Sequence, residues 1–501
     1  MFEKTVQQMS LTMRSALLTA IIVLGVLLRG WNIQQGLWWD EIWSTLEYAT
    51  ASSWWYTISQ LGYYFNNHPL YSIAARISIA VLGASEFSLR LPSVLMGTAA
   101  LPVLYLLARP LTGTAPALLA TLLLALSAFH IDHSSEARGY SGMLLFALLA
   151  SLFFFKALNG ASKRAWIFFV LCTFLGFYCH VYMAQVPLAQ VMCCVLLMAE
   201  QALRKERNRF MYAGALRHLV LALAAAAVLT LAAYAPMLKF FVANAGKVQL
   251  LRVDRLPFVA EMYETVLPGF ATLPGMLLYS ALFVCGLLYL GKRSPALLIY
   301  TILICNIPLL LYLQLNPMFI FKRYFLPALP FCLLTLACGM EWIAHSCRLR
   351  GLARIAFYCC VLCAIAWLQW PSIRTVTTQS RQHYREAAVY AADHSDASDA
   401  VFAIGQAGQH FSYYATVPVL VPETFDGFQM RLHEVPQAWC LISAWLPELR
   451  PAHEPFLLYT EDPEHQRIYD YVKAHFQLAA QFHGVFNTYV YRWPAAAEAR
   501  P

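Results

Sequence analysis

The sequence predicts a mainly α-helical protein that crosses a membrane many times and ends in a small α/β domain. Of its 501 residues, 60% are hydrophobic and only 12% are charged, whereas soluble domains have about 45 to 50% apolar and about 25% charged residues. A single water-facing core cannot bury so much apolar surface, so a bilayer has to solvate most of the chain. After residue 379 the composition changes to that of a soluble domain.

Apolar runs near the roughly 20 residues of a spanning helix recur through residues 1–372, the expected transmembrane domain. Lys4 and Arg14 precede the first run, and no small-residue cleavage site follows it, so we interpret it as an uncleaved span. We expect eleven spans, at residues 15–31, 92–108, 115–130, 142–157, 165–179, 181–200, 217–236, 275–291, 295–313, 324–344 and 353–370.

The basic residues give the expected orientation, because short cytoplasmic connections are enriched in Lys and Arg. They concentrate between alternate spans if the N-terminus is inside, as at Lys292 and Arg293. We therefore expect a multi-pass protein of the inner (plasma) membrane, with the loop 32–91 and the C-terminal domain facing outward into the periplasm. The net charge of +8 is explained by these clusters, which form no continuous basic face for nucleic acid.

The loop 32–91 and the segment 379–493 are the two expected extramembrane parts. The loop contains five tryptophans, and Trp concentrates where apolar and aqueous environments meet, so we expect short interfacial helices. The C-terminal segment has the alternation of an α/β domain, but no Gly-rich phosphate loop. Its expected strands are 400–404, 417–421, 439–442 and 488–493, and its expected helices are 384–393 and 464–476.

The adjacent carboxylates Asp40 and Glu41 follow Trp38 and Trp39 directly outside the first span. Carboxylates are difficult to hold near apolar surroundings, which favours a purpose such as orienting or deprotonating an attacking hydroxyl. The alternative is an ordinary acidic pair at the start of a surface helix.

Two further polar segments lie between apolar runs. His68 precedes Pro69, which predicts the start of a helix. The segment 130–141 contains Glu136, Arg138 and Tyr140, and a cation at the start of a span requires an anionic partner, either a lipid phosphate or Glu136. Its His and acidic residues match no specific metal-binding spacing.

Lys322 and Arg323 form a second cationic point on the expected outer side, where basic residues are disfavoured. A phosphate in the outer leaflet would explain the pair, and anchoring at the interface is the alternative. His180 lies in a short outer turn and either belongs to the same polar site or satisfies a helix end.

Four motifs taken together resemble the GT-C class of membrane glycosyltransferases, and more closely the bacterial relatives of protein O-mannosyltransferases and of the lipid A aminoarabinose transferase. They are residues 39–41, 68–71, 86–93 and 135–140. Their order and spacing are specific, although each motif alone is weak. The resemblance covers residues 15–200 well and the C-terminal domain hardly at all.

The resemblance implies an enzyme that moves a sugar from a polyprenyl-phosphate donor to an acceptor hydroxyl on the outer face, with inversion. Asp40 matches the first-loop acid of the class, Glu41 its neighbour, and Arg138 the cation of the Glu-Ala-Arg-x-Tyr segment. Leu70 stands where many members have a second Pro, and the β-trefoil insert of the eukaryotic protein mannosyltransferases is absent. These departures argue against a protein acceptor. The acceptor hydroxyl can belong to a lipid, a glycan or a protein.

This scheme assigns Arg138, Lys322 and Arg323 to the donor phosphate, with His68, Glu136 and Tyr140 in support. No metal or other cofactor is required, and a divalent metal is possible but not indicated. We expect the C-terminal domain to modulate acceptor choice, since its polar residues form no recognisable catalytic set. The main alternative is a transporter or flippase for lipid-linked glycans, which would not need the Asp40 and Glu41 pair. A sensor that binds an outer ligand has only the α/β domain in its favour.

Overall fold

The structure is a computed structural model that describes residues 10–60, 66–158, 160, 163–203, 211–244, 255–315, 321–404, 407–443, 463–484 and 486–493. The chain forms two compact units. The first, which we call the helical unit, contains Met1–Ile33 and Ala51–Thr377. The second, the α/β unit, contains Gln34–Thr50 and Thr378–Pro501. Each unit is described by itself.

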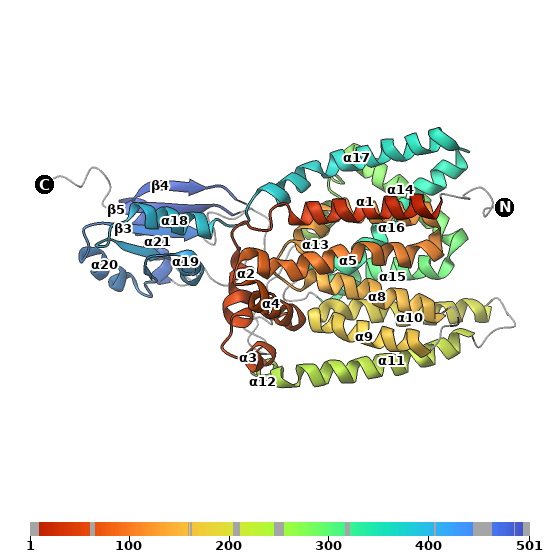
Figure 1. Cartoon of the computed structure of the whole chain (residues 1–501), viewed down its shortest axis with the longest axis horizontal. Helices are drawn as coiled ribbons and strands as arrows, with labels where there is room; N and C mark the ends of the chain where they lie inside the picture. Colours follow the sequence, from red (N-terminus) through yellow and green to blue (C-terminus); the bar gives the residue numbers. More distant parts are fainter. Residues whose placement is uncertain are drawn as a thin grey trace. The chain divides into compact units, whose positions relative to one another are not determined.

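The helical unit is a bundle of long apolar helices with short ones at one end (Figure 1). Its helices are α1 (Leu11–Gly30), α3 (Trp54–Ser59), α4 (Pro69–Leu82), α5 (Glu86–Thr112), α6 (Thr114–Leu126), α7 (Ala128–Ser134), α8 (Tyr140–Leu158), α9 (Lys163–Cys179), η3 (Val181–Ala184), α10 (Gln185–Leu203), α11 (Met211–Tyr234), η4 (Ala235–Met237), α12 (Leu238–Asn244), α13 (Arg255–Val266), α14 (Leu273–Arg293), α15 (Pro295–Leu315), η5 (Lys322–Ala328), α16 (Leu329–Ser346) and α17 (Gly351–Thr378).

Within the described residues, eight helical segments are long and apolar enough to cross a membrane, and this is a multi-pass membrane protein. The bent pair α6 and α7 gives a ninth candidate if it counts as one span. The predicted spans 165–179 and 295–313 are also helical, as α9 and α15, but neither is among the eight. The count of eleven therefore stays a prediction.

Glycines let the helices α14 and α16 cross with their backbones in contact. A Cβ atom at Gly286 would collide with the carbonyl oxygen of Thr335, and one at Gly339 with that of Leu282. Helices in a bilayer gain little from apolar burial against each other, so small residues that permit close packing stabilise such crossings. These glycines therefore permit the close packing of α14 and α16.

A buried arginine holds the break between α6 and α7, which are bent by 61° at Ser127. The Arg29 guanidinium of α1 donates to the carbonyl oxygens of Leu124 and Ala125, both at 3.3 Å, and contacts His130 Nδ1 at 2.7 Å. The last carbonyls of a helix have no intrahelical partner. Arg29 therefore supplies the donors that α6 lacks at its end.

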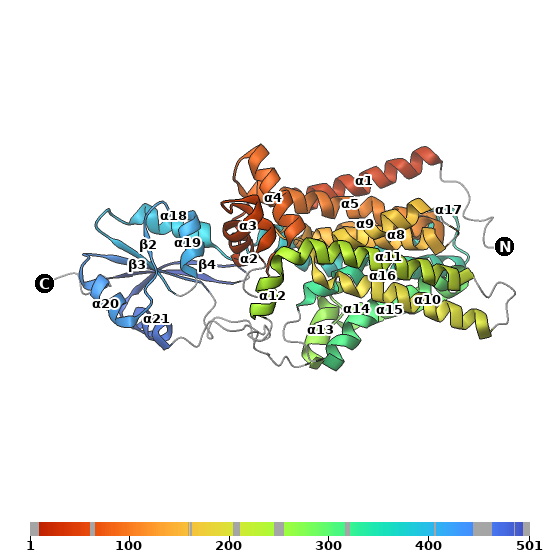
Figure 2. The same ribbon diagram turned by 90° about the horizontal axis from the view of Figure 1, so that it is seen from below.

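The α/β unit contains a five-stranded sheet with two helices on each face, α18 and α19 on one and α20 and α21 on the other (Figure 2). The strand order is β2, β1, β3, β5, β4, with β1, β2 and β3 parallel and β5 antiparallel to both its neighbours. The elements are β1 (Ala400–Ala403), β2 (Val419–Leu420), β3 (Ala438–Ser443), β4 (Gln477–Phe482), β5 (Thr488–Trp493), α18 (Tyr384–His394), α19 (Gly408–Tyr414), α20 (Phe425–His433) and α21 (Pro463–His475).

The predicted small α/β domain is confirmed, and the structure adds elements that were not predicted. The four expected strands and both expected helices are present, within a few residues of their predicted bounds. The strand β4 and the helices α19 and α20 were missed. The segment 34–50, which the sequence analysis assigned to the transmembrane domain, groups with this unit as α2 (Trp39–Ser44) and the π-helix η1 (Thr45–Ala49).

Candidate active site

The aromatic ring of Tyr140 is the centre of a polar cluster in the helical unit. The ring centroids of His68, His180 and His133 lie 4.9, 5.4 and 5.4 Å from it. The guanidinium carbons of Arg323 and Arg138 lie 5.1 and 5.8 Å from the same centroid. Three imidazoles and two guanidinium groups thus surround one buried phenol ring, and we call these six residues the Tyr140 cluster.

The members of the cluster come from the ends of helices and from the loops that join them. Tyr140 is the first residue of α8, and His68 is the N-cap of α4, with Pro69 in the first turn as predicted. His180 lies between α9 and η3, where Tyr182 N donates to its Nδ1 at 3.1 Å. His180 therefore both satisfies a helix end and belongs to the polar site, so the two predicted alternatives hold together.

Arg138 is buried, and both its side chain and its backbone are hydrogen-bonded. Its guanidinium donates to Asn66 Oδ1, and its carbonyl oxygen accepts from Ser93 Oγ of α5 at 2.8 Å. It is 1% exposed, whereas Arg323 is only partly buried and also lies 4.4 Å over the ring of Phe321. The cluster therefore pairs one fixed cation with one that is nearer to solvent.

The lack of a side chain at Gly139 allows His68 to enter the cluster. A Cβ atom at this position would lie 2.9 Å from both Cβ and Nδ1 of His68 and 3.0 Å from the carbonyl oxygen of Cys179. Such distances are well inside van der Waals contact. Gly139 thus fixes how closely the loop before α8 approaches α4 and the end of α9.

The hydrogen bonds assign opposite tautomers to the two neighbouring histidines, whose ring centroids are 5.0 Å apart. His68 Nδ1 lies 3.0 Å from the carbonyl oxygen of Cys179, which can only accept, so this nitrogen carries the hydrogen. His180 Nδ1 accepts from a backbone N–H, so the hydrogen of a neutral ring lies on Nε2. His68 therefore offers an acceptor at Nε2, and His180 offers a donor.

The surroundings of both histidines favour the neutral ring. Burial, together with the charges of Arg138 and Arg323, lowers the pKa of His180 to about 3. Burial also holds the pKa of His68 well below its usual range, with Arg138 and His180 adding to the effect. Arg138 and Arg323 therefore bring positive charge to the cluster that His68 and His180 do not, and a cationic site of this kind favours an anion.

Glu136 and Lys322 lie beside the cluster, and each has an oppositely charged or polar partner. Glu136 Oε2 is 2.9 Å from Nδ1 of His133, and both side chains are buried. Lys322 Nζ is 3.0 Å from Glu261 Oε2 of α13, and both of these side chains are partly exposed. Among the described residues no group of three His, Cys, Asp or Glu side chains is placed to hold a metal ion.

The predicted acids Asp40 and Glu41 lie in the α/β unit, in the first turn of α2. Glu41 is 1% exposed, and its Oε2 accepts from Trp38 N at 3.1 Å, which closes the start of the helix. Asp40 is partly exposed. Glu41 thus caps its own helix, and the chemical roles of both acids stay predictions.

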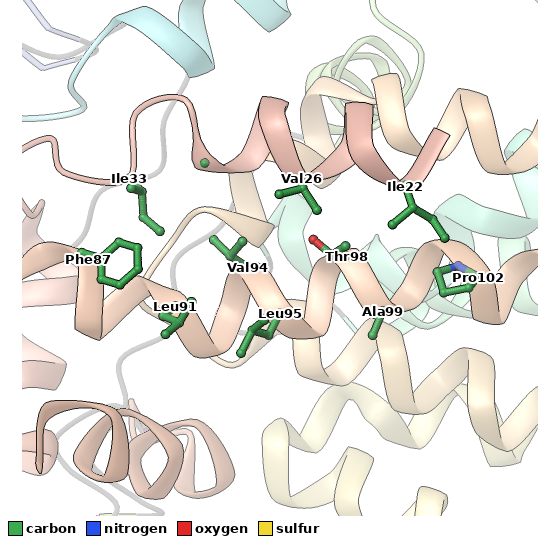
Figure 3. A pocket seen from close by; sticks show the side chains of 11 residues that line it. Ile22, Val26, Ile33, Phe87, Leu91, Val94, Leu95, Thr98, Ala99 and Pro102 are labelled. Atoms are coloured by element: carbon green, nitrogen blue, oxygen red, sulfur yellow. The ribbon is translucent and has the colours of Figure 1, made fainter. Parts of the chain in front are cut away.

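An apolar groove of about 460 Å³ runs between α1 and α5 (Figure 3). Ile22, Val26, Phe87 and Leu91 are among its lining side chains, and Thr98 supplies a single hydroxyl. Both helices are among the eight candidate spans. A lining of this kind suits a hydrocarbon chain.

Comparison with known proteins supports the resemblance to membrane glycosyltransferases. Residues 66–229 match the family described as dolichyl-phosphate-mannose-protein mannosyltransferase. The crystal structure of ArnT from Cupriavidus metallidurans in the apo state matches with a TM-score of 0.59 and 13% identity, over 97% of this chain and 99% of that one. The chain has the fold of a GT-C membrane glycosyltransferase.

Two further solved structures share this fold. ArnT bound to undecaprenyl phosphate matches with a TM-score of 0.56 and 12% identity, over 98% of this chain and 100% of that one. The apo oligosaccharyltransferase of Archaeoglobus fulgidus matches with a TM-score of 0.51 and 13% identity, over 88% of this chain and 70% of that one. No curated protein sequence matches the chain. The family match contains every member of the Tyr140 cluster except Arg323.

Proposed function

We propose that the protein is a glycosyltransferase that moves a sugar from a polyprenyl-phosphate donor to an acceptor hydroxyl on the outer face of the membrane, with inversion. The observation that carries this proposal is the Tyr140 cluster. It presents two guanidinium groups and two neutral imidazoles in a membrane protein with the fold of an enzyme whose solved complex holds undecaprenyl phosphate.

The donor's leaving group explains the need for such cations. Polyprenyl phosphate gains one negative charge as the bond between its oxygen and the anomeric carbon breaks. Arg138 and Arg323 would stabilise that charge, and the Nε2 hydrogen of His180 would add a neutral donor. Of the three predicted cations, Lys322 is the weakest candidate for binding the phosphate, because it already forms an ion pair with Glu261.

The acceptor side requires a base. The acceptor oxygen attacks the anomeric carbon from the face opposite the phosphate, which inverts its configuration, and the hydroxyl proton passes to a carboxylate. We assign this role to Asp40, which is partly exposed, whereas the Glu41 carboxylate is occupied in closing α2. The groove between α1 and α5 is a candidate for the hydrocarbon chain of a lipid substrate.

The purified full-length protein tests this function. Incubation with a labelled polyprenyl-phosphate sugar and envelope glycolipid acceptors should release polyprenyl phosphate and transfer the label to the acceptor. The matched Asp40→Asn protein should bind the donor and not transfer the sugar. Movement of intact labelled donor across vesicles, without cleavage in either protein, would favour the flippase and exclude the enzyme.

The outward location is tested separately, because it rests on the distribution of basic residues. Reporter fusions after Lys292 and after Trp493 should report inside and outside, respectively. Activity of a cytoplasm-only reporter at Trp493 would contradict both the topology and an outward-facing acceptor site.

A further inference from the structure

The segment that carries Asp40 is bound along its length by the α/β unit. Leu37 N donates to Tyr414 Oη at 2.7 Å, and Arg385 Nη1 donates to the carbonyl oxygen of Gln34 at 2.9 Å. The guanidinium of Arg381 lies 4.4 Å over the ring of Trp38. Residues 34–50 therefore pack as a part of this domain, although more than 300 residues separate them from it in sequence.

Both backbone polar groups of Trp39, the residue immediately before Asp40, are bonded to buried side chains of the domain. Trp39 N donates to Gln382 Oε1 at 2.9 Å, and the Trp39 carbonyl oxygen accepts from His410 Nε2 at 3.2 Å. Gln382 and His410 are each 0% exposed. Buried hydrogen bonds to the main chain fix its position, because breaking one leaves an unsatisfied polar group.

The ring of Trp39 is fixed by the same histidine. It stacks on His410 with a centroid distance of 3.8 Å and an interplanar angle of 15°, and Tyr384 contacts the histidine at 5.4 Å. One imidazole thus binds both the side chain and the carbonyl of Trp39. The backbone entering Asp40 has little freedom left.

This attachment lies at the carboxyl end of the parallel strands. Gln382 Nε2 also donates to Ser443 Oγ at the carboxyl end of β3, at 3.4 Å, and His410 is in α19, which follows the parallel strand β1. Ligands of open α/β sheets bind outside the carboxyl ends of parallel strands. Here a segment of the chain itself is anchored at that end.

We infer that the α/β unit positions the proposed catalytic base, with His410 and Gln382 as positioning residues that fix Asp40 through Trp39. This inference rests on the proposed role of Asp40 and extends it. The domain was expected to modulate acceptor choice, and the inference gives it a direct part in the rate of the chemical step. Donor binding does not depend on this attachment.

Steady-state kinetics of full-length variants tests the inference. His410→Ala should lower kcat by about 10- to 100-fold, because a displacement of about 1 Å of a reacting group has effects of this size. Donor affinity should stay the same. His410→Gln restores an N–H donor and should recover part of the rate, and His433→Ala, an exposed histidine of α20, serves as the control and should match wild type.

A double-mutant cycle separates positioning from a general structural role. If His410 acts through Asp40, His410→Ala should have almost no further effect in the Asp40→Asn background. Equal effects in both backgrounds, or a parallel loss of donor affinity, would overturn the inference. If His410→Ala does not fold, Tyr414→Phe removes one hydroxyl that accepts from Leu37 and is compared in the same cycle.

Hydrogen exchange provides a readout that does not depend on the reaction. Gln382→Ala should accelerate exchange of the amides of residues 38–41 at least tenfold, while the control Gln466→Ala, at a partly exposed glutamine of α21, should leave them unchanged. Unchanged exchange in Gln382→Ala would refute the positioning of this segment by the α/β unit. Full activity of Asp40→Asn would instead refute the proposed base and leave the exchange result to decide the attachment alone.

Discussion

The Tyr140 cluster and the Asp40 segment bring two opposite charges to the proposed reaction by different physical means. The cluster is assembled inside the helical unit from the ends of several helices, and burial there lowers the pKa of His68 and His180. Asp40 lies in the first turn of the six-residue helix α2, which is hydrogen-bonded to distant residues of the α/β unit. The cations should therefore tolerate changes in the α/β unit, whereas the acid should not.

The largest expected effect is the loss of turnover when Asp40 is replaced. Asp40→Asn keeps the shape of the side chain and removes the base, so turnover should fall by a factor of about 10² to 10⁴ while donor binding stays nearly intact. Glu41→Gln should lower the rate less, because an amide oxygen can still accept from Trp38 N. Sugar transfer at close to the wild-type rate by Asp40→Asn would move the search for the base to Glu136 and His68.

The next largest effect is on donor affinity, which should differ among variants of the three cationic residues. Arg138→Ala should weaken donor binding by about 1.5 to 3 kcal/mol, the size of a hydrogen bond to a charged group. Arg323→Ala should act in the same direction, and Lys322→Ala should have a smaller effect because of its ion pair with Glu261. Calorimetric titration with polyprenyl phosphate measures all three, and equal affinities throughout would remove the cluster from the donor site.

The geometry of the cluster is tested at Gly139. Gly139→Ala places a methyl group against His68 and the Cys179 carbonyl, and overpacking of this kind destabilises by about 1 to 3 kcal/mol. Donor affinity should fall, and the exchange of residues 38–41 in the α/β unit should not change. Gly214→Ala, where no atom lies within 4 Å of the added Cβ, is the matched control.

The smallest effect is the pH dependence of stability. The folded-state pKa of His180 is about 3, below the value of about 6.5 of an unfolded chain, so the unfolded state binds more protons between these values. Stability is therefore complete above about pH 6.5 and falls as the pH is lowered toward 3. Thermal unfolding of His180→Asn should show a shallower loss between pH 7 and pH 5, and identical slopes would contradict the assignment.

The sequence predicts these two regions unequally well. Apolar runs located the helices, and the polar segments at their ends identified Arg138, Tyr140 and His68. The strand β4 was missed because Gln477–Phe482 does not alternate regularly between polar and apolar residues, and its side chains are exposed or only partly buried. Contacts across the fold, such as that of Lys322 with Glu261, leave no local signal.

The attachment of the acid shows the same limit more clearly. Trp39 and Gln382 are 343 positions apart, and neither His410 nor Gln382 lies in a recognisable motif. The tryptophans beside Asp40 suggested an interfacial loop, but Trp39 is buried against an imidazole. Its burial partner could be found only from the tertiary structure.

The buried arginine of α1 has a consequence for the biogenesis of the protein. Arg29 donates to the carbonyl of a residue 95 positions later, at the point where α6 ends. During synthesis the ribosome delivers Arg29 well before that segment, so the donor is already present when the broken helix emerges. The donor that α6 needs at its end thus belongs to a span that is synthesised before it.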